Sequence, residues 1–176
     1  MTGARQLLLD AEAEYAGAIF SPCEAYRYRL WRRWHQTDPY LLFVLLNPST
    51  ADAEKDDPTV RRCSRRARRL GFGGVEVVNI YALRSTDPRA LRGHPNPVGP
   101  SNDAAIASAA RAAGGIIVAW GDQTPRLGQA FADRTAAVMD ILGRSTVKVW
   151  CLGTTAAGFP RHPLYLPNDV QLKAYG

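Results

Sequence analysis

Mostly apolar runs alternate with helical patterns along most of the chain. Four such runs, each bounded by turn residues, lie at 41–46, 75–80, 116–120 and 147–152. Between them, apolar residues recur at helical spacing over about 57–70, 102–113 and 126–142. Strands that are apolar on both faces and alternate with helices are typical of a parallel sheet covered on both sides. The pattern therefore predicts a three-layer α/β/α fold around a four-stranded parallel sheet.

The first 40 residues show a different pattern. Residues 4–15 carry helix formers and apolar positions at helical spacing, which predict a short N-terminal helix. From Ile19 to Trp34, two short strands flank a turn at 21–24, and this predicts a β-hairpin at the edge of the domain. We expect a single domain over residues 1–176, in which residues 1–40 extend the α/β core.

Composition narrows the class of protein. Of the 176 residues, 46% are apolar and 22% are charged, as in ordinary globular proteins. No apolar run approaches the ~20 residues that span a bilayer, and no basic-plus-apolar leader opens the sequence. The three cysteines, Cys23, Cys63 and Cys151, are widely spaced, which disfavours a disulfide framework or a zinc site. We expect a cytoplasmic monomer without membrane contact, metal or cofactor.

Positive charge concentrates in one predicted helix. The formal net charge of +6 favours an anionic partner, nucleic acid first. Six arginines of the 57–70 pattern fall within nine residues: Arg61, Arg62, Arg65, Arg66, Arg68 and Arg69. They are candidate phosphate contacts, although a general preference for arginine or a solvated helix face would give the same cluster.

Polar residues follow each of the four predicted strands. They are, in strand order, Asn47, Pro48, Ser49 and Thr50; Asn79, Tyr81 and Arg84; Trp120, Gly121 and Asp122; and Gly153, Thr154 and Thr155, followed by Arg161, His162 and Pro163. Ligands of open α/β sheets bind outside the carboxyl ends of the strands, so we expect these residues to converge on one site. The irregular segment 84–101, with four prolines, also follows a strand end and is a candidate binding loop.

An acidic run precedes the arginine-rich helix. Asp52, Glu54, Asp56 and Asp57 have the oxygen ligands that hard cations choose. The same residues suit a helix start, where carboxylates stabilise the positive end of the dipole. We favour helix capping over a metal site. Thr59 would then face the mouth of the predicted site, where helix N-termini attract phosphate.

Several motifs resemble those of an uncharacterised bacterial and phage domain family. The segments are LLNPSTAD, DDPTVRRC, VVNIYALRSTDP, NPVGPSND and AWG, in this order. The resemblance covers roughly residues 19–166. It indicates a family but no function.

A more distant resemblance, to the uracil-DNA glycosylase superfamily, implies both that superfamily's α/β/α fold with a four-stranded parallel sheet and a function. The segment 45–49 is similar to the G-I-N-P-G type of motif at the end of that superfamily's first strand. The resemblance implies that Asn47 positions the attacking water. Residues 78–81 and 118–121 resemble the ends of its second and third strands. His162 falls on its His-Pro-Ser motif and would donate to the base.

The chain departs from that superfamily in four respects. Leu45 and Ser49 replace the two glycines of the first motif, which limits backbone approach to a ligand. Leu164 replaces the serine after His162-Pro163. The aspartate of the most active branch is also absent.

These observations predict a nucleic-acid-acting enzyme that hydrolyses the N-glycosidic bond of a damaged or modified base, in DNA repair or base modification. Asn47 and His162 are the candidate catalytic residues, expected to share one pocket with Tyr81 or Trp120 as a wall. The candidate substrate contacts, with DNA as the favoured partner, are Pro48, Ser49, Thr50, Thr59, Arg61, Arg62, Arg65, Arg66, Arg69, Asn79, Tyr81, Arg84, Trp120, Gly121 and Arg161. Tyr81, Trp120 and Phe43 are candidates for stacking on the base.

Two other functions fit the same residues. One is a module that binds a nucleotide or modified base without chemistry, and the other is an enzyme acting on free nucleotides. Each residue also has a structural interpretation. Residues 47–50 can form a turn and cap, Trp120 can belong to the core, and His162 can be a loop residue.

Overall fold

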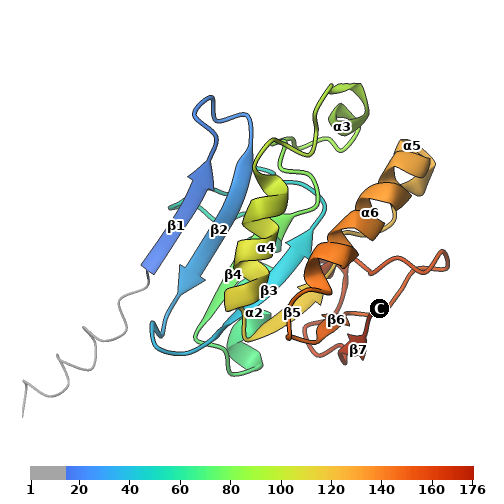
Figure 1. The fold of residues 1–176 in the computed structure, drawn as a ribbon. Coiled ribbons are helices and arrows are strands. Elements are labelled where there is room, and N and C mark those ends of the chain that lie inside the picture. The colour runs from blue at the N-terminus through green and yellow to red at the C-terminus, as the bar shows by residue number, and fades with distance from the viewer. Residues whose placement is uncertain (1–14) are drawn as a thin grey trace, which may run out of the picture.

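The central element is a seven-stranded mixed sheet. The computed structural model describes residues 15–176, so the predicted N-terminal helix lies outside the described residues, apart from Tyr15, which begins the first strand. The strand order is β1-β2-β4-β3-β5-β6-β7. Figure 1 shows the chain entering at one edge of the sheet and ending at the other.

The four central strands are parallel, as the apolar runs predict. They are β3 (Tyr40–Leu45), β4 (Gly74–Asn79), β5 (Gly115–Val118) and β6 (Val149–Cys151). β3 pairs with both β4 and β5, which sets Phe43 beside Val77 and Ile117. Every residue of β3, β4 and β5 is buried. Because these strands are parallel, their carboxyl ends lie at one edge of the sheet, and the predicted site residues follow there.

The sheet is larger than the four strands predicted, because three antiparallel strands extend it. The predicted hairpin is present as β1 (Tyr15–Phe20) and β2 (Arg27–Arg33), and β2 continues the sheet by pairing with β4. At the other edge, β7 (Lys173–Ala174) pairs with β6. The hairpin is thus part of the sheet, with β1 as the edge strand, as its short alternating pattern suggests.

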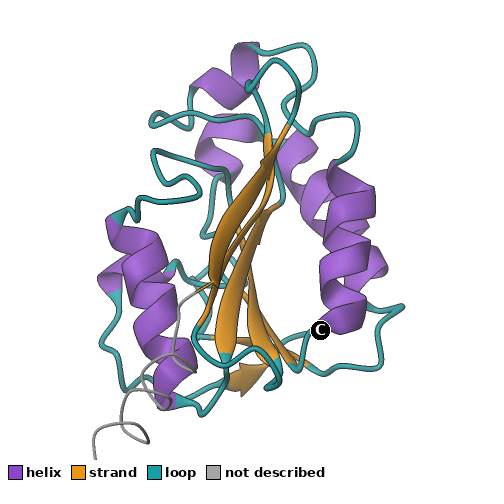
Figure 2. Ribbon diagram, turned by 90° about the vertical axis from the view of Figure 1, so that its left-hand side faces the viewer, coloured by secondary structure: helices purple, strands orange, loops and turns teal. Residues whose placement is uncertain are grey.

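Helices cover both faces of the central strands (Figure 2). Helix α2 (Pro58–Arg69) packs on one face through Val60, Cys63 and Ala67. Helices α4 (Asn102–Ala112) and α6 (Gln129–Leu142) pack on the other, where Ile106 and Phe131 join the core. The three-layer arrangement and these three helices agree with the sequence pattern.

Two segments differ in detail from their predictions. The pattern at 126–142 is divided into α5 (Thr124–Leu127) and α6, because Gly128 has a φ of 59° that a helix cannot contain. The segment 84–101 is irregular but includes a short helix, α3 (Ala90–Gly93). None of the helices among residues 15–176 has the length and apolar character needed to cross a bilayer.

Candidate functional site

Asn47 lies half-buried just beyond β3, with a defined amide orientation. Its side chain faces two backbone carbonyls, those of Ser85 at 2.8 Å and Pro48 at 3.2 Å. Since carbonyl oxygens only accept, the amide nitrogen must face them. The amide oxygen of Asn47 makes no hydrogen bond to any described residue. Asn47 therefore ties together the loops after β3 and β4 and leaves one acceptor open.

Arg27 is a buried residue of this edge that the sequence pattern did not reveal. It starts β2, and its guanidinium donates to the Ala51 carbonyl at 2.7 Å and to Oδ1 of Asn79 at 3.4 Å. Its Nε has no hydrogen-bond partner among the described residues. Burial lowers the pKa of Arg27 to about 10, although Asp57 opposes the shift. The guanidinium of Arg27 is thus bound to the loop that follows β3 and carries the predicted motif at 47–50.

His162 precedes a one-turn 3₁₀ helix, η1 (Pro163–Tyr165), and lies against the turn after β5. A Cβ added at Gly121 would be 3.8 Å from the His162 Cβ. Nδ1 of His162 accepts a hydrogen bond from the Leu164 amide at 3.3 Å. Burial lowers the pKa of His162, while Asp57 opposes this. A neutral imidazole that accepts at Nδ1 must have its proton on Nε2, so His162 presents a donor.

The acidic run caps and braces the start of α2, as we favoured from the sequence. Oδ1 of Asp57, the N-cap, accepts from the Val60 amide at 2.8 Å. Asp52 accepts from two backbone amides of its own loop. Asp56 pairs with Arg32 of β2 at 2.8 Å. Within residues 15–176, no three His, Cys, Asp or Glu side chains are grouped to hold a metal ion.

Two arginines of the α2 cluster hold the C-terminal segment. Arg62 donates to the carbonyl of Leu166 at 2.6 Å. Arg66 donates to the carbonyls of Pro167 and Val170 at 2.8 and 3.0 Å, and the whole residue is 3% exposed. Burial also lowers the pKa of Arg66. Arg66 thus serves packing and is not accessible to a phosphate.

The other arginines of α2 face solvent. Arg61, Arg65, Arg68 and Arg69 are exposed. Arg61, Arg65 and Arg68 line an open groove of about 380 Å³ between α2 and the hairpin. The guanidinium of Arg68 lies 3.9 Å from the ring centroid of Trp34 in this groove. Positions 61, 65 and 68 share one face of the helix, so their charges act on the same surface.

The candidate stacking residues are buried. Trp120 is 1% exposed, and Tyr81 and Phe43 also belong to the core. Tyr81 reaches a pocket of about 310 Å³ beside α3 and α5, on the α4 side of the sheet. The pockets beside the hairpin, beside α2, beside α3 and between α4 and α6 are lined by residues other than Asn47 and His162. One pocket shared by Asn47 and His162, with an aromatic wall, stays a prediction.

The remaining predicted residues divide by burial. Pro48 and Asn79 are buried; Ser49, Thr59, Arg84 and Gly121 are half-buried; Thr50 and Arg161 are exposed. Asn79 is engaged by Arg27. Arg84 donates to the Glu24 carbonyl at 3.1 Å. The carboxyl edge of the sheet thus has buried polar residues, such as Asn79, beneath exposed ones, such as Thr50 and Arg161.

Comparison with known proteins places the chain in a family. It is 37% identical over 111 residues to the tryptophan synthase alpha chain of Laribacter hongkongensis, which is 61% of this chain and 40% of that relative. Because the chain spans only about 40% of the relative's length, this likeness carries no argument about activity. No solved structure matches the chain significantly. A family model described as "Protein of unknown function (DUF1643)" matches residues 27–164, and the chain belongs to this family.

Proposed function

We propose that the chain is a nucleic-acid-acting enzyme of glycosylase-like fold, which hydrolyses the N-glycosidic bond of a damaged or modified base. The observation that carries the proposal is the orientation of Asn47 and His162. The amide of Asn47 is fixed by Ser85 so that its oxygen is the open group. The Nδ1 contact of His162 leaves the Nε2 proton as the open group.

This pair of open groups suits the chemistry. Cleavage of an N-glycosidic bond builds positive charge on the sugar and negative charge on the departing base. The oxygen of Asn47 can accept a proton from water and orient it toward the sugar carbon. The Nε2 proton of His162 can be donated to a base oxygen as its charge develops. Burial, which disfavours the charged imidazole, keeps His162 a neutral donor.

The surface around α2 supports a polymeric substrate. Arg61, Arg65 and Arg68 line one groove beside the helix that follows Asn47, and with Arg32 they outnumber the two carboxylates there, Glu54 and Asp56. Phosphate contacts of this kind position a nucleic acid without reading its sequence. Arg66 is withdrawn from this role by its burial and its bonds to two carbonyls. Arg61 and Arg62 each use one amino group on a backbone carbonyl, that of Asp56 and that of Leu166.

The second candidate function is base or nucleotide binding without chemistry. One observation favours it: Trp120 and Tyr81, the rings expected to stack on a base, are buried, and the exposed ring beside His162 is that of Tyr165, 6.2 Å away between ring centroids. A flipped base would need such a platform or an equivalent apolar wall.

The test is incubation with oligonucleotides that carry uracil, hypoxanthine, mismatches or alkylated bases, followed by an assay for abasic sites. We expect Asn47→Ala to lower turnover far more than binding, because water positioning matters mainly in the transition state. His162→Ala should lower turnover by roughly 10²–10³-fold, the usual effect of losing one such donor. His35→Ala, at an exposed histidine elsewhere, should leave turnover unchanged.

The possible outcomes separate the candidates. Binding without abasic sites would support the binding module. Abasic sites that form equally in the wild type and in both variants would show that other residues carry the chemistry.

A further inference from the structure

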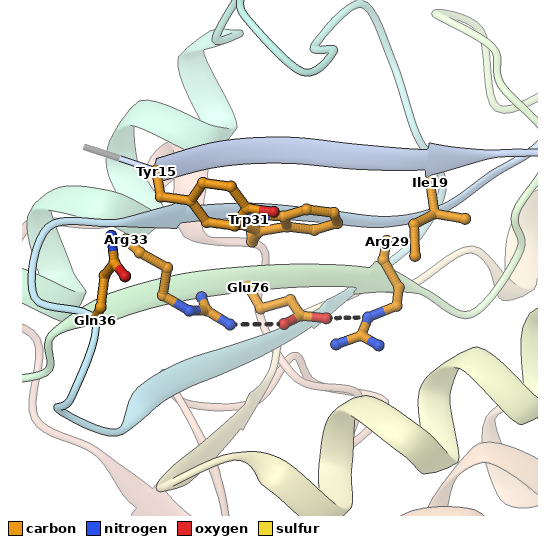
Figure 3. Close-up of a pocket in the computed structure, with 7 residues that line it drawn as sticks. All are labelled: Tyr15, Ile19, Arg29, Trp31, Arg33, Gln36 and Glu76. Atoms are coloured by element: carbon orange, nitrogen blue, oxygen red, sulfur yellow. Dashed lines mark hydrogen bonds and ion pairs between the residues drawn. The ribbon is translucent and has the colours of Figure 1, made fainter. Parts of the chain in front are cut away.

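The hairpin side of the sheet has an open pocket lined by other residues than the groove between α2 and the hairpin. The pocket measures about 360 Å³ and is lined by side chains of β1, β2 and β4, chiefly Tyr15, Ile19, Arg29, Trp31, Arg33 and Glu76 (Figure 3). Glu76 and Arg33 lie toward the amino end of β4, since Arg33 is opposite Gly74. The pocket is therefore separate from the carboxyl edge. Among the described helices, none lies in front of β1 (Figure 1).

The floor of the pocket is a buried carboxylate clamped by two arginines. Glu76 is fully buried and pairs with Nε of Arg29 and with Nη2 of Arg33, the latter at 2.9 Å. Arg33 also donates to the Val75 carbonyl at 3.0 Å and lies 4.0 Å above the Tyr40 ring. These contacts fix both guanidinium groups. Two cations face one anion, so the floor keeps one net positive charge.

Arg29 retains binding capacity. Its Nε is used by Glu76, but its two terminal amino groups make no hydrogen bond to any described residue. Arginine presents its donors in a rigid fork that matches carboxylate and phosphate oxygens. Since Glu76 already orders this fork, little conformational freedom remains to be lost when an anion binds.

The walls of the pocket are aromatic and apolar. Three ring atoms of Trp31 would lie within 2.9 Å of a Cβ added at Gly17, so the indole packs flat on the bare backbone of β1. The ring of Tyr15 is 6.0 Å from that of Trp31, inclined by 33°. Tyr15 is 56% and Ile19 43% exposed, although both are large apolar side chains. The indole nitrogen of Trp31 is buried without a hydrogen-bond partner among the described residues.

We propose that this pocket binds a nucleobase together with its phosphate. The base stacks on the rings of Tyr15 and Trp31, and its phosphate accepts hydrogen bonds from the terminal amino groups of Arg29. Aromatic stacking beside arginine is the usual basis of single-strand binding, because every base has a π-face. The pocket volume suits a ligand of nucleotide size. This site does not depend on the glycosylase proposal.

A base with its phosphate can come from two ligands, a free nucleotide or a single-stranded nucleic acid. The test uses the full chain with thymidine monophosphate in one arm and a labelled oligothymidylate in the other. Binding is measured by calorimetry and fluorescence anisotropy. Oligothymidylate carries no damaged base, so the result is independent of the abasic-site assay. Binding in both arms assigns the pocket to the nucleotide unit, and binding of the oligomer alone assigns it to single strands.

Two variants link the binding to this pocket. Tyr15→Ala should weaken binding by about tenfold, the lower part of the range for one lost stacking contact. Arg29→Lys keeps the charge beside Glu76 but loses the fork, and should also weaken binding. Arg111→Lys makes the same exchange at an exposed position of α4 and should have no effect.

Three results would overturn the proposal. The first is no binding of either probe at low salt. The second is binding that Tyr15→Ala and Arg29→Lys leave unchanged while both variants remain folded. The third is a dimer in sedimentation that Tyr15→Ala dissociates, since a second copy of the chain would then occupy the face.

Discussion

The parallel centre of the sheet and the β1–β2 hairpin use the same kind of backbone for different purposes. All six residues of β3 are buried, whereas β1 buries only Gly17. The central strands lie between helices and are apolar on both faces, as parallel strands usually are. The hairpin alternates arginine with aromatic and aliphatic residues and keeps one face open.

The two regions position their side chains in different ways. Residues that follow the central strands, such as Asn47, are positioned by a packed core. The hairpin instead places its own side chains on the surface, where Glu76 orders them through ion pairs. Burial of a strand therefore fixes the groups at its end, while exposure of a strand makes its own side chains available.

Phe43→Ala should give the largest loss of stability. Phe43 is fully buried at the centre of β3, and removing its ring leaves a cavity that neighbours on two strands cannot fill. We expect about 3–5 kcal/mol less free energy of unfolding, measured by denaturant titration. Phe20→Ala makes the same change at the half-exposed end of β1 and should cost less. Equal losses would contradict the contrast between centre and hairpin.

Glu76→Gln should have an intermediate effect. It removes the charge that both Arg29 and Arg33 share and leaves two cations side by side. Complete loss of a partner from a buried ion pair costs about 3–5 kcal/mol, but these arginines reach solvent in part, so we expect about 1–3 kcal/mol. Glu54→Gln, at an exposed carboxylate, serves as the control. If Glu76→Gln is neutral, the strand ladder alone attaches the hairpin to β4.

The sequence predicted the central strands well because their signal is local. Each strand is an apolar run between turns, and burial on both faces follows from that composition. The hairpin was also predicted from its turn and alternation. Its pairing with β4 was not, because β3 and α2 lie between them in sequence. Sheet order depends on such distant contacts, which no local pattern records.

The candidate site was predictable to a similar extent. Asp57 caps α2 and Asn47 lies just beyond β3, as local rules for helix starts and turns predict, while a pocket shared by Asn47 and His162 stays a prediction. Arg27 and Arg66 look like surface residues in the sequence, yet both are buried by long-range hydrogen bonds to carbonyls. Trp120 follows an apolar strand and is buried in the hydrophobic core. Residue type therefore indicated the edge, but not which of its side chains reach solvent.

Ile19→Ala should have the smallest effect and is the sharpest test of the open face. Ile19 is 43% exposed beside Tyr15 and Trp31, so its truncation should change the free energy of unfolding by about 0.5 kcal/mol or less. Ile117→Ala, the same change at a fully buried position of β5, should cost about 2–5 kcal/mol. Both are measured by denaturant titration under identical conditions. A loss at Ile19 that approaches the loss at Ile117 would mean that this face is covered in solution. The pocket beside Arg29 would then be filled by protein, and no nucleotide could enter it.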